Sequence, residues 1–192
     1  VHTIFHSEHN RLAEEIGGVG GVGGLIDTLL TPAEAAEWRA VNPASGWGYG
    51  ERVFQAARFV TEMEYQHLVF EEFARTLAPS INAFVVDGIN FQSNKNPAIS
   101  AEFAHAVYRL GHSMLTATIA RSNPDDPGQT NDITLFEGFL NPTAFNWASG
   151  NPNTDPPTWN SASEAAGVIF QGGSRQVGNQ IDEFVTDVLR NE

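Results

Sequence analysis

The sequence contains no cysteine, which excludes disulfide bonds, thiolate metal sites and cysteine nucleophiles. It is also poor in positive charge, because 10 lysine and arginine residues stand against 23 acidic residues, for a formal net charge of -13. Binding to nucleic acid depends on cationic side chains, so no nucleic acid partner is expected. No apolar run approaches the roughly 20 residues that a membrane-spanning helix needs, and no membrane span is expected.

Size and composition favour one compact body. With 192 residues, 41% of them hydrophobic, the chain can bury one core, which predicts a single domain or part of one. Scarce lysine, abundant asparagine and glycine, and net acidity indicate an exported, extracellular bacterial protein. Both ends continue a helical pattern without a cap or a closing loop, which predicts an internal piece of a longer polypeptide.

The hydrophobic pattern is mostly helical. Apolar residues recur at helical spacing over residues 3–16, 51–77 and 97–115, which predicts three helices. Residues 31–34 (TPAE) predict a capping box and an N-terminal proline for a short helix that ends near Val41. The predicted fold class is therefore mainly α, with long irregular loops and little or no β structure.

Two stretches interrupt this pattern. Residues 17–31 begin with a run of glycines that predicts a flexible surface insertion, and the run lacks the lysine and hydroxyl residue of a phosphate-binding loop. Residues 123–160 are rich in asparagine, aspartate and proline, and predict a loop-rich insertion. The acidic residues between 125 and 132 lack the spacing of an EF-hand, so a solvated loop is expected there.

The helix predicted over residues 97–115 uses two faces. Opposite its apolar side, polar residues recur at helical spacing, and Gly111 removes bulk beside one of them, so that a flat ligand can approach. These polar residues are His105, Tyr108, Arg109, His112 and Thr116. By residue chemistry alone, His112 is open to three interpretations: a structural histidine, a metal ligand or a haem ligand.

Four segments carry a resemblance to a known family. Residues 2–12 (HTIFHSEHNRL) resemble the motif H-T-x-x-x-x-E-H-N-R-L of haem peroxidases of the animal (peroxidase-cyclooxygenase) type. Residues 51–58 (ERVFQAAR) are similar to E-R-L-[YF]-Q-x-A-R, which begins the family's long helix, and residues 108–113 (YRLGHS) resemble F-R-[FY]-G-H-[ST] of its proximal-histidine helix. Residues 180–190 resemble its Q-I-x-x-x-V-x-[DE]-x-[LI]-R helix. These segments follow the family order, and the resemblance covers most of the chain, excluding the glycine-rich insertion and residues 123–160. It implies that residues 1–192 are part of one catalytic domain of a bacterial myeloperoxidase- and peroxidasin-like branch.

The resemblance implies a cofactor and a reaction. Haem b would be bound. His112 would be the metal ligand, as the axial ligand of the haem iron, and Arg109 would pair with a haem propionate. Hydrogen peroxide and a small reducing substrate, either a halide or an organic donor, would be consumed. In the family an asparagine that follows the last of these helices accepts a hydrogen bond from the axial histidine, which strengthens the electron donation that favours O–O cleavage.

The same resemblance implies that the distal part of the site lies elsewhere. The family's distal histidine, catalytic arginine and acidic calcium-binding loop all precede the motif at residues 2–12. No catalytic residue is therefore assigned in this chain, and these groups, with any calcium, are expected in the remainder of the same polypeptide or in companion chains. His9 and Arg11 belong to a different motif and are expected to pack helices and form ion pairs.

Two alternatives remain open at this point. The chain could be a non-catalytic structural or interaction module of a large secreted protein that has lost haem. It could also belong to a fatty-acid dioxygenase or cyclooxygenase-like relative, which would need a radical-forming tyrosine further along the polypeptide. Tyr108 is a poor candidate for that role because it lies on the helix of the axial ligand. An upstream distal histidine would favour the peroxidase.

Overall fold

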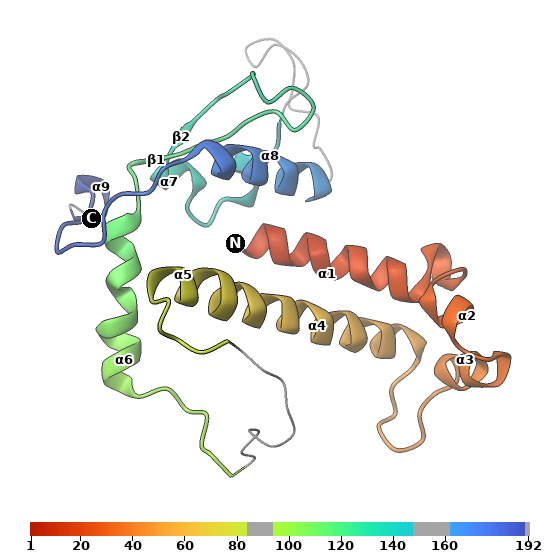
Figure 1. Ribbon diagram of the computed structural model, residues 1–192. Coiled ribbons are helices and arrows are strands. Elements are labelled where there is room, and N and C mark those ends of the chain that lie inside the picture. The colour runs from red at the N-terminus through yellow and green to blue at the C-terminus, as the bar shows by residue number, and fades with distance from the viewer. Residues whose placement is uncertain (84–93, 148–161, 191–192) are drawn as a thin grey trace. The chain divides into compact units, whose positions relative to one another are not determined.

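A computed structural model of the chain describes residues 1–83, 94–147 and 162–190. The chain divides into two compact units, Val1–Ser93 and Asn94–Glu192, each with its own internal contacts (Figure 1). Within the described residues the secondary structure is mainly helical, and the strands form one two-stranded sheet. The predicted mainly α fold is therefore confirmed.

The first unit is built on a helix pair, in which α1 lies along α4 (Figure 1). Its helices are α1 (His2–Gly17), η1 (Val19–Gly21), α2 (Leu25–Leu29), α3 (Pro32–Arg39), α4 (Tyr49–His67), η2 (Leu68–Ala74) and α5 (Arg75–Leu77). The last three are continuous, since the residues at their junctions keep right-handed helical backbone angles. The long helix predicted over residues 51–77 is thus confirmed, with the π-helical η2 replacing α-helix near its end.

The glycine-rich segment of residues 17–31 is more structured than a flexible insertion. Ile26 of α2 is 4% exposed and joins Ala35 and Val53 in a buried cluster. The Asp27 carboxylate accepts a hydrogen bond from the Gly23 N–H at 2.7 Å and pairs with Arg39 at 2.7 Å. Burial of Ile26 and the contacts of Asp27 order the segment, which the glycine content alone did not indicate.

The predicted capping box is present at the start of α3. The Thr31 hydroxyl accepts from the Glu34 N–H at 3.4 Å, and the Glu34 carboxylate accepts from the Thr31 N–H at 2.9 Å. Pro32 occupies the first turn, where its missing N–H costs no hydrogen bond. The helix ends at Arg39, two residues before the predicted end.

The second unit combines short helices with the small sheet. Its elements are α6 (Ala101–His105), η3 (Val107–Met114), β1 (Thr118–Ile119), β2 (Ile133–Thr134), α7 (Leu135–Gly138), η4 (Pro142–Phe145), α8 (Ala162–Arg175) and α9 (Asp187–Arg190). The antiparallel strands pair Thr118 with Thr134 and Ile119 with Ile133. Helix α8 was not predicted, and its Gly172 is required because a side chain there would collide with the Ala120 carbonyl.

Two sequence predictions in this unit need correction. The continuous α-helix expected over residues 97–115 is wrong, because Ala106 (φ -127°, ψ -67°) interrupts it and the part beyond is the 3₁₀ helix η3. The helix that the resemblance implied over residues 180–190 is reduced to α9, since the Asp182 carboxylate accepts from the Phe184 N–H at 2.9 Å and forms a turn. The stretch predicted to be loop-rich, residues 123–160, contains the short elements β2, α7 and η4 in its described part, and residues 148–160 lie outside the described residues.

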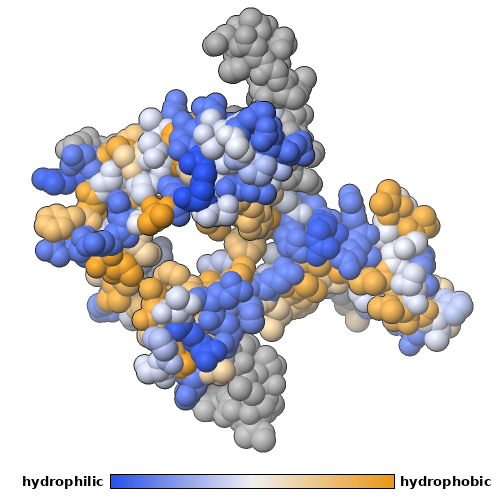
Figure 2. Space-filling view, turned by 45° about the horizontal axis from the view of Figure 1, so that its top comes forward, coloured by the Kyte–Doolittle hydropathy of each residue, from blue (hydrophilic) through white to orange (hydrophobic). Residues whose placement is uncertain are grey.

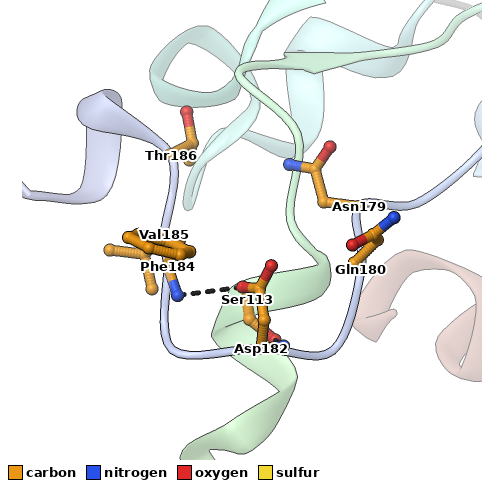
Figure 3. Close-up of a pocket in the computed structure, with 7 residues that line it drawn as sticks. All are labelled: Ser113, Asn179, Gln180, Asp182, Phe184, Val185 and Thr186. Carbon is orange, nitrogen blue, oxygen red and sulfur yellow. Dashed lines mark hydrogen bonds between the residues drawn. The ribbon is translucent and has the colours of Figure 1, made fainter.

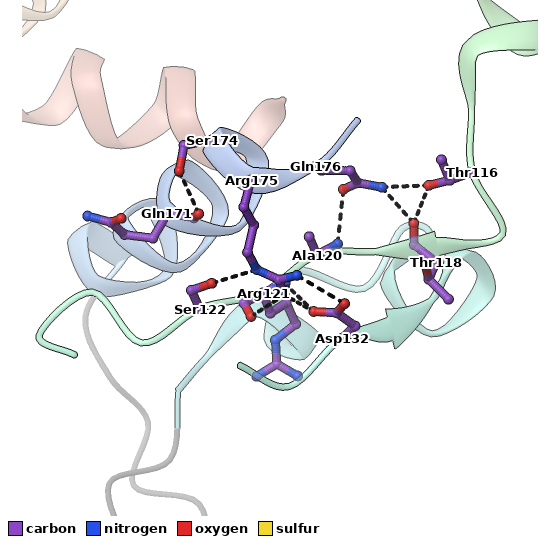
Figure 4. A network of polar contacts seen from close by, with 10 residues as sticks. All are labelled: Thr116, Thr118, Ala120, Arg121, Ser122, Asp132, Gln171, Ser174, Arg175 and Gln176. Carbon is purple, nitrogen blue, oxygen red and sulfur yellow. Dashed lines mark hydrogen bonds and ion pairs between the residues drawn. The ribbon is translucent and has the colours of Figure 1, made fainter. Parts of the chain in front are cut away.

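A polar network joins the end of α8 to the chain around the sheet (Figure 4). Arg175 donates to the Ser122 hydroxyl and to the Arg121 carbonyl, both at 3.0 Å, and forms an ion pair with Asp132. The hydrogen bond from Arg175, assisted by the Arg121 N–H, lowers the pKa of Asp132, and burial lowers the pKa of Arg121. The side-chain carbonyl of Gln176 accepts a hydrogen bond from the Ala120 N–H at 3.0 Å. The network holds α8 in place where the backbone of Gly172 lies close to the Ala120 carbonyl.

Large hydrophobic side chains appear on the surface of both units (Figure 2). Phe59 on α4 is 66% exposed, and Phe103 and Leu110 in the second unit are also exposed. Since few large side chains are buried in either unit, caps and ion pairs contribute a relatively large part of the stability. No described helix is both long and apolar enough to cross a membrane.

Replacing Thr31 with alanine tests the cap of α3. Thr31→Ala should lower the free energy of unfolding of the first unit by about 1 kcal/mol, because the Glu34 N–H loses its acceptor. Chemical denaturation followed by circular dichroism measures the change, and Thr31→Ser, which keeps the hydroxyl, is the matched control. Equal stability of the alanine and serine variants would contradict the role of the cap.

The pair between Asp132 and Arg175 should make the second unit sensitive to acid. Because the folded-state pKa of Asp132 lies below its ordinary value of about 3.9, the pair stabilises the fold above that pH, and this contribution disappears as the pH falls through the folded-state pKa. The free energies of unfolding of wild type and Asp132→Asn should therefore differ near neutrality and converge in acid. Denaturation across this pH range, with exposed Asp125→Asn as control, checks the expectation; a difference independent of pH would refute it.

Candidate functional site

His112 and Arg109 lie together on η3, and both side chains are exposed. Residues three apart align along a 3₁₀ helix, so the imidazole and the guanidinium project from the same line of the surface. The His112 side chain forms no hydrogen bond with any of the described residues, and the Arg109 guanidinium lies 5.7 Å from the Tyr108 ring centroid. An imidazole without a partner can ligate a metal, and the neighbouring guanidinium can at the same time bind an acidic group.

The surface next to His112 is apolar and open. Val107, Tyr108 and Leu110 are between 47% and 56% exposed on the same short helix. A methyl group added at Gly111 would meet one atom within 4 Å, the Met114 Cε at 3.8 Å. The packing of the chain itself therefore does not require glycine there, and a flat apolar ligand would meet little bulk beside the imidazole.

The break at Ala106 divides the polar face that was predicted for a continuous helix. His105 ends α6 before the break. Thr116 follows the end of η3, and its hydroxyl donates to the Thr118 carbonyl and accepts from Gln176, each at 2.5 Å. Of the five predicted residues, Tyr108, Arg109 and His112 remain on one element, and the other two lie outside it.

His9 and Arg11 of α1 have structural partners, as predicted. A ring nitrogen of His9 lies 3.1 Å from the Phe54 carbonyl oxygen, and the two rings are 4.6 Å apart, so His9 links α1 to α4. Arg11 forms ion pairs with Glu8 and Glu15, each at 2.6 Å. His9 and Arg11 are thus a helix-packing residue and an ion-pair residue.

The donor set fits haem better than a bare metal ion. Within the described part of the chain, no three histidine or acidic side chains gather closely enough to hold a metal. A structural zinc ion needs four protein ligands, whereas haem iron takes four nitrogens from its macrocycle and needs one proximal protein ligand. A single unpaired histidine with apolar surface and an arginine nearby meets these requirements.

Sequence reasoning missed the residues that pack against the far end of η3. A cavity of about 280 Å³ lies there, and residues 179–186 curve around the end of the helix (Figure 3). Its lining comprises Ser113, Asn179, Gln180, Asp182, Phe184, Val185 and Thr186. Two signals could have indicated it: the serine that follows His112, and the turn-forming Gly178-Asn179 pair.

Comparison with known proteins places the chain in the class of peroxidases, because the similar proteins are named as peroxidases or peroxidasin. Heme peroxidase 2 of Caenorhabditis elegans is 31% identical over 121 residues, and thyroid peroxidase of Homo sapiens is 25% identical over 150 residues. Peroxidasin of Drosophila melanogaster is 24% identical over 152 residues. The model of the animal haem peroxidase family matches residues 1–192, and the chain belongs to this family.

The matches cover much of this chain and little of each relative. They include 59% of the chain for heme peroxidase 2, 74% for thyroid peroxidase and 78% for peroxidasin. The chain spans 13% of the length of the first two relatives and 8% of the third. No solved structure matches it. Family membership is thus shown, and the activity of the whole protein is a matter for proposal.

The free imidazole of His112 should be chemically reactive. In the haem-free protein, diethylpyrocarbonate should modify His112 faster than His9, because His112 is exposed and unpaired whereas His9 contacts the Phe54 carbonyl. Mass spectrometry of peptides after timed treatment measures both rates, and exposed His105 provides the reference for an accessible ring. A His112 rate as low as that of His9 would contradict the exposed position.

Proposed function

We propose that this chain supplies the proximal haem side of a peroxidase, with His112 as the axial iron ligand. The observation that carries the proposal is the exposed His112, which has no hydrogen-bond partner among the described residues and lies on the same line of η3 as Arg109, in a chain that belongs to the animal haem peroxidase family. Haem b, when bound, supplies the iron at which hydrogen peroxide is reduced and a halide or small organic donor is oxidised.

The residues of this chain bind and orient the cofactor in this proposal. Neutral His112 offers one ring nitrogen as a ligand and keeps an N–H on the other, which can donate to an acceptor and raise the electron density on the ligating nitrogen. Arg109 offers a planar guanidinium whose charge and N–H groups suit a propionate carboxylate. The apolar side chains of Val107 and Leu110, which are exposed in this chain, would exclude water beside the ligand once haem covers them.

Peroxide cleavage itself needs groups that are not assigned among these residues. We propose that a distal histidine and arginine, and any calcium, come from the remainder of the polypeptide or from companion chains. We also propose an extracellular location, supported by the acidic composition. A bacterial source stays a prediction from that composition.

Haem titration of the purified protein tests the axial ligand. Wild type should develop a Soret band at about 400 nm. His112→Ala should bind haem about 10-fold more weakly or worse, because the iron loses its protein ligand. Added imidazole should restore the band in the variant, since it can replace the missing ring. Arg109→Ala should also weaken binding, and Arg109→Lys less so, because lysine keeps the charge.

The matched control for this titration is His105→Ala, which removes another exposed histidine from the adjacent helix α6. Its haem affinity should equal that of wild type. A Soret band that survives unchanged in His112→Ala would refute the assignment of the ligand. Failure of the wild-type protein to bind added haem would instead favour a non-catalytic structural module.

A further inference from the structure

The carbonyl groups at the end of η3 are capped by a residue far along the chain. The backbone N–H of Asn179 donates to the Met114 carbonyl at 3.0 Å, and its side-chain amide donates to the Leu115 carbonyl at 2.6 Å. The last carbonyls of a helix find no partner within the helix itself. Asn179 therefore provides a C-terminal cap through a tertiary contact.

Ser113, the residue that follows His112, makes the second connection. It is 5% exposed, and its side chain is the buried one on η3. Its hydroxyl donates to the Leu110 carbonyl at 3.0 Å and accepts from the Asp182 N–H at 3.4 Å. Figure 3 shows Ser113 enclosed by the loop that carries Asn179 and Asp182. Ser113 thus ties its own turn to this loop.

The close approach of the two segments depends on Gly178. A Cβ atom at this position would lie 3.3 Å from the Met114 carbonyl oxygen, which is tighter than ordinary contact. A side chain at this position would require the loop or the end of η3 to shift by a few tenths of an ångström, which would disturb the bonds of Asn179. The Gly178-Asn179 pair is therefore suited to capping the helix, and not merely to making a turn.

His112 has few other constraints on its backbone. The break at Ala106 ends the regular helix, so that η3 meets α6 mainly through the stacked rings of Phe103 and Tyr108, and most side chains of η3 are exposed. Neither a continuous helix nor extensive burial holds the segment. The contacts of Ser113 and Asn179 begin at the next residue along the chain, so they restrict where the His112 imidazole can point.

We propose that Ser113 and Asn179 are positioning residues that fix the backbone of His112 and so direct its imidazole. The effect on haem rests on the proposed function, whereas the effect on the backbone does not. A metal–imidazole bond is directional, and loss of residues that orient a ligand typically weakens metal binding by about 10-fold to 100-fold. Ser113 and Asn179 act through His112 and need not touch the cofactor.

Two variants remove these contacts with little change in size. Asn179→Asp replaces the donating amide with an acceptor, and Ser113→Ala removes the hydroxyl. Each should weaken haem binding by about 10-fold and alter the Soret band and the iron–histidine stretching frequency, because the imidazole is less well oriented. Ser113→Thr keeps the hydroxyl and should restore wild-type spectra. Gln180→Ala, an exposed position lining the same cavity, is the matched control.

Hydrogen exchange in the haem-free protein gives an independent measurement. The Leu115 N–H donates to the His112 carbonyl at 3.3 Å, so its exchange reports the order of the ligand segment. Asn179→Asp and Ser113→Ala should accelerate this exchange by about 10-fold, with far-ultraviolet circular dichroism unchanged, and Gln180→Ala should not.

The outcomes separate the two proposals. Unchanged Leu115 exchange in both variants overturns the positioning role, whether or not haem binds. Where His112→Ala does weaken haem binding, faster exchange combined with haem affinity and spectra equal to those of Gln180→Ala overturns it as well. Haem binding that is insensitive to His112→Ala refutes the proposed function instead, and faster Leu115 exchange would then still support the hold on the His112 backbone.

Discussion

The position of His112 depends on hydrogen bonds that close the end of a short 3₁₀ helix. A helix this short has few hydrogen bonds of its own, and its terminal carbonyls need partners from other segments. Here the partner for the Leu115 carbonyl is 64 residues later in the chain. Since most of η3 is exposed and a break separates it from α6, this contact and the buried Ser113 link the candidate ligand to the body of the second unit.

Each unit uses a different device to compensate for a small core. In the first, α1 and α4 pack along one another, and polar groups such as His9 add a bond between the helices. In the second, a charged network around Arg175 joins α8 to the chain near the sheet. The ionic contacts fix the position of α8 as much as they stabilise the fold, because exposed pairs contribute little free energy individually.

Features encoded locally were predicted well. The capping box of Thr31 and Glu34 was readable because a cap depends on residues three apart in sequence. The long helix over residues 51–77 followed from its periodicity. The break at Ala106 could not be predicted, since neither glycine nor proline stands there. Helix α8 was not predicted, and one of its glycines, Gly172, is explained only by its close packing on Ala120.

The sequence by itself determined the family, through motifs whose order and spacing are preserved, and identified His112 and Arg109 as the residues to examine. It could not show that these two remain aligned while His105 and Thr116 leave the same face, nor that Asn179 caps the helix. Periodicity records which residues share a face of a regular element. Where an element breaks and which distant segment satisfies its end depend on tertiary hydrogen bonds, which short-range patterns do not contain.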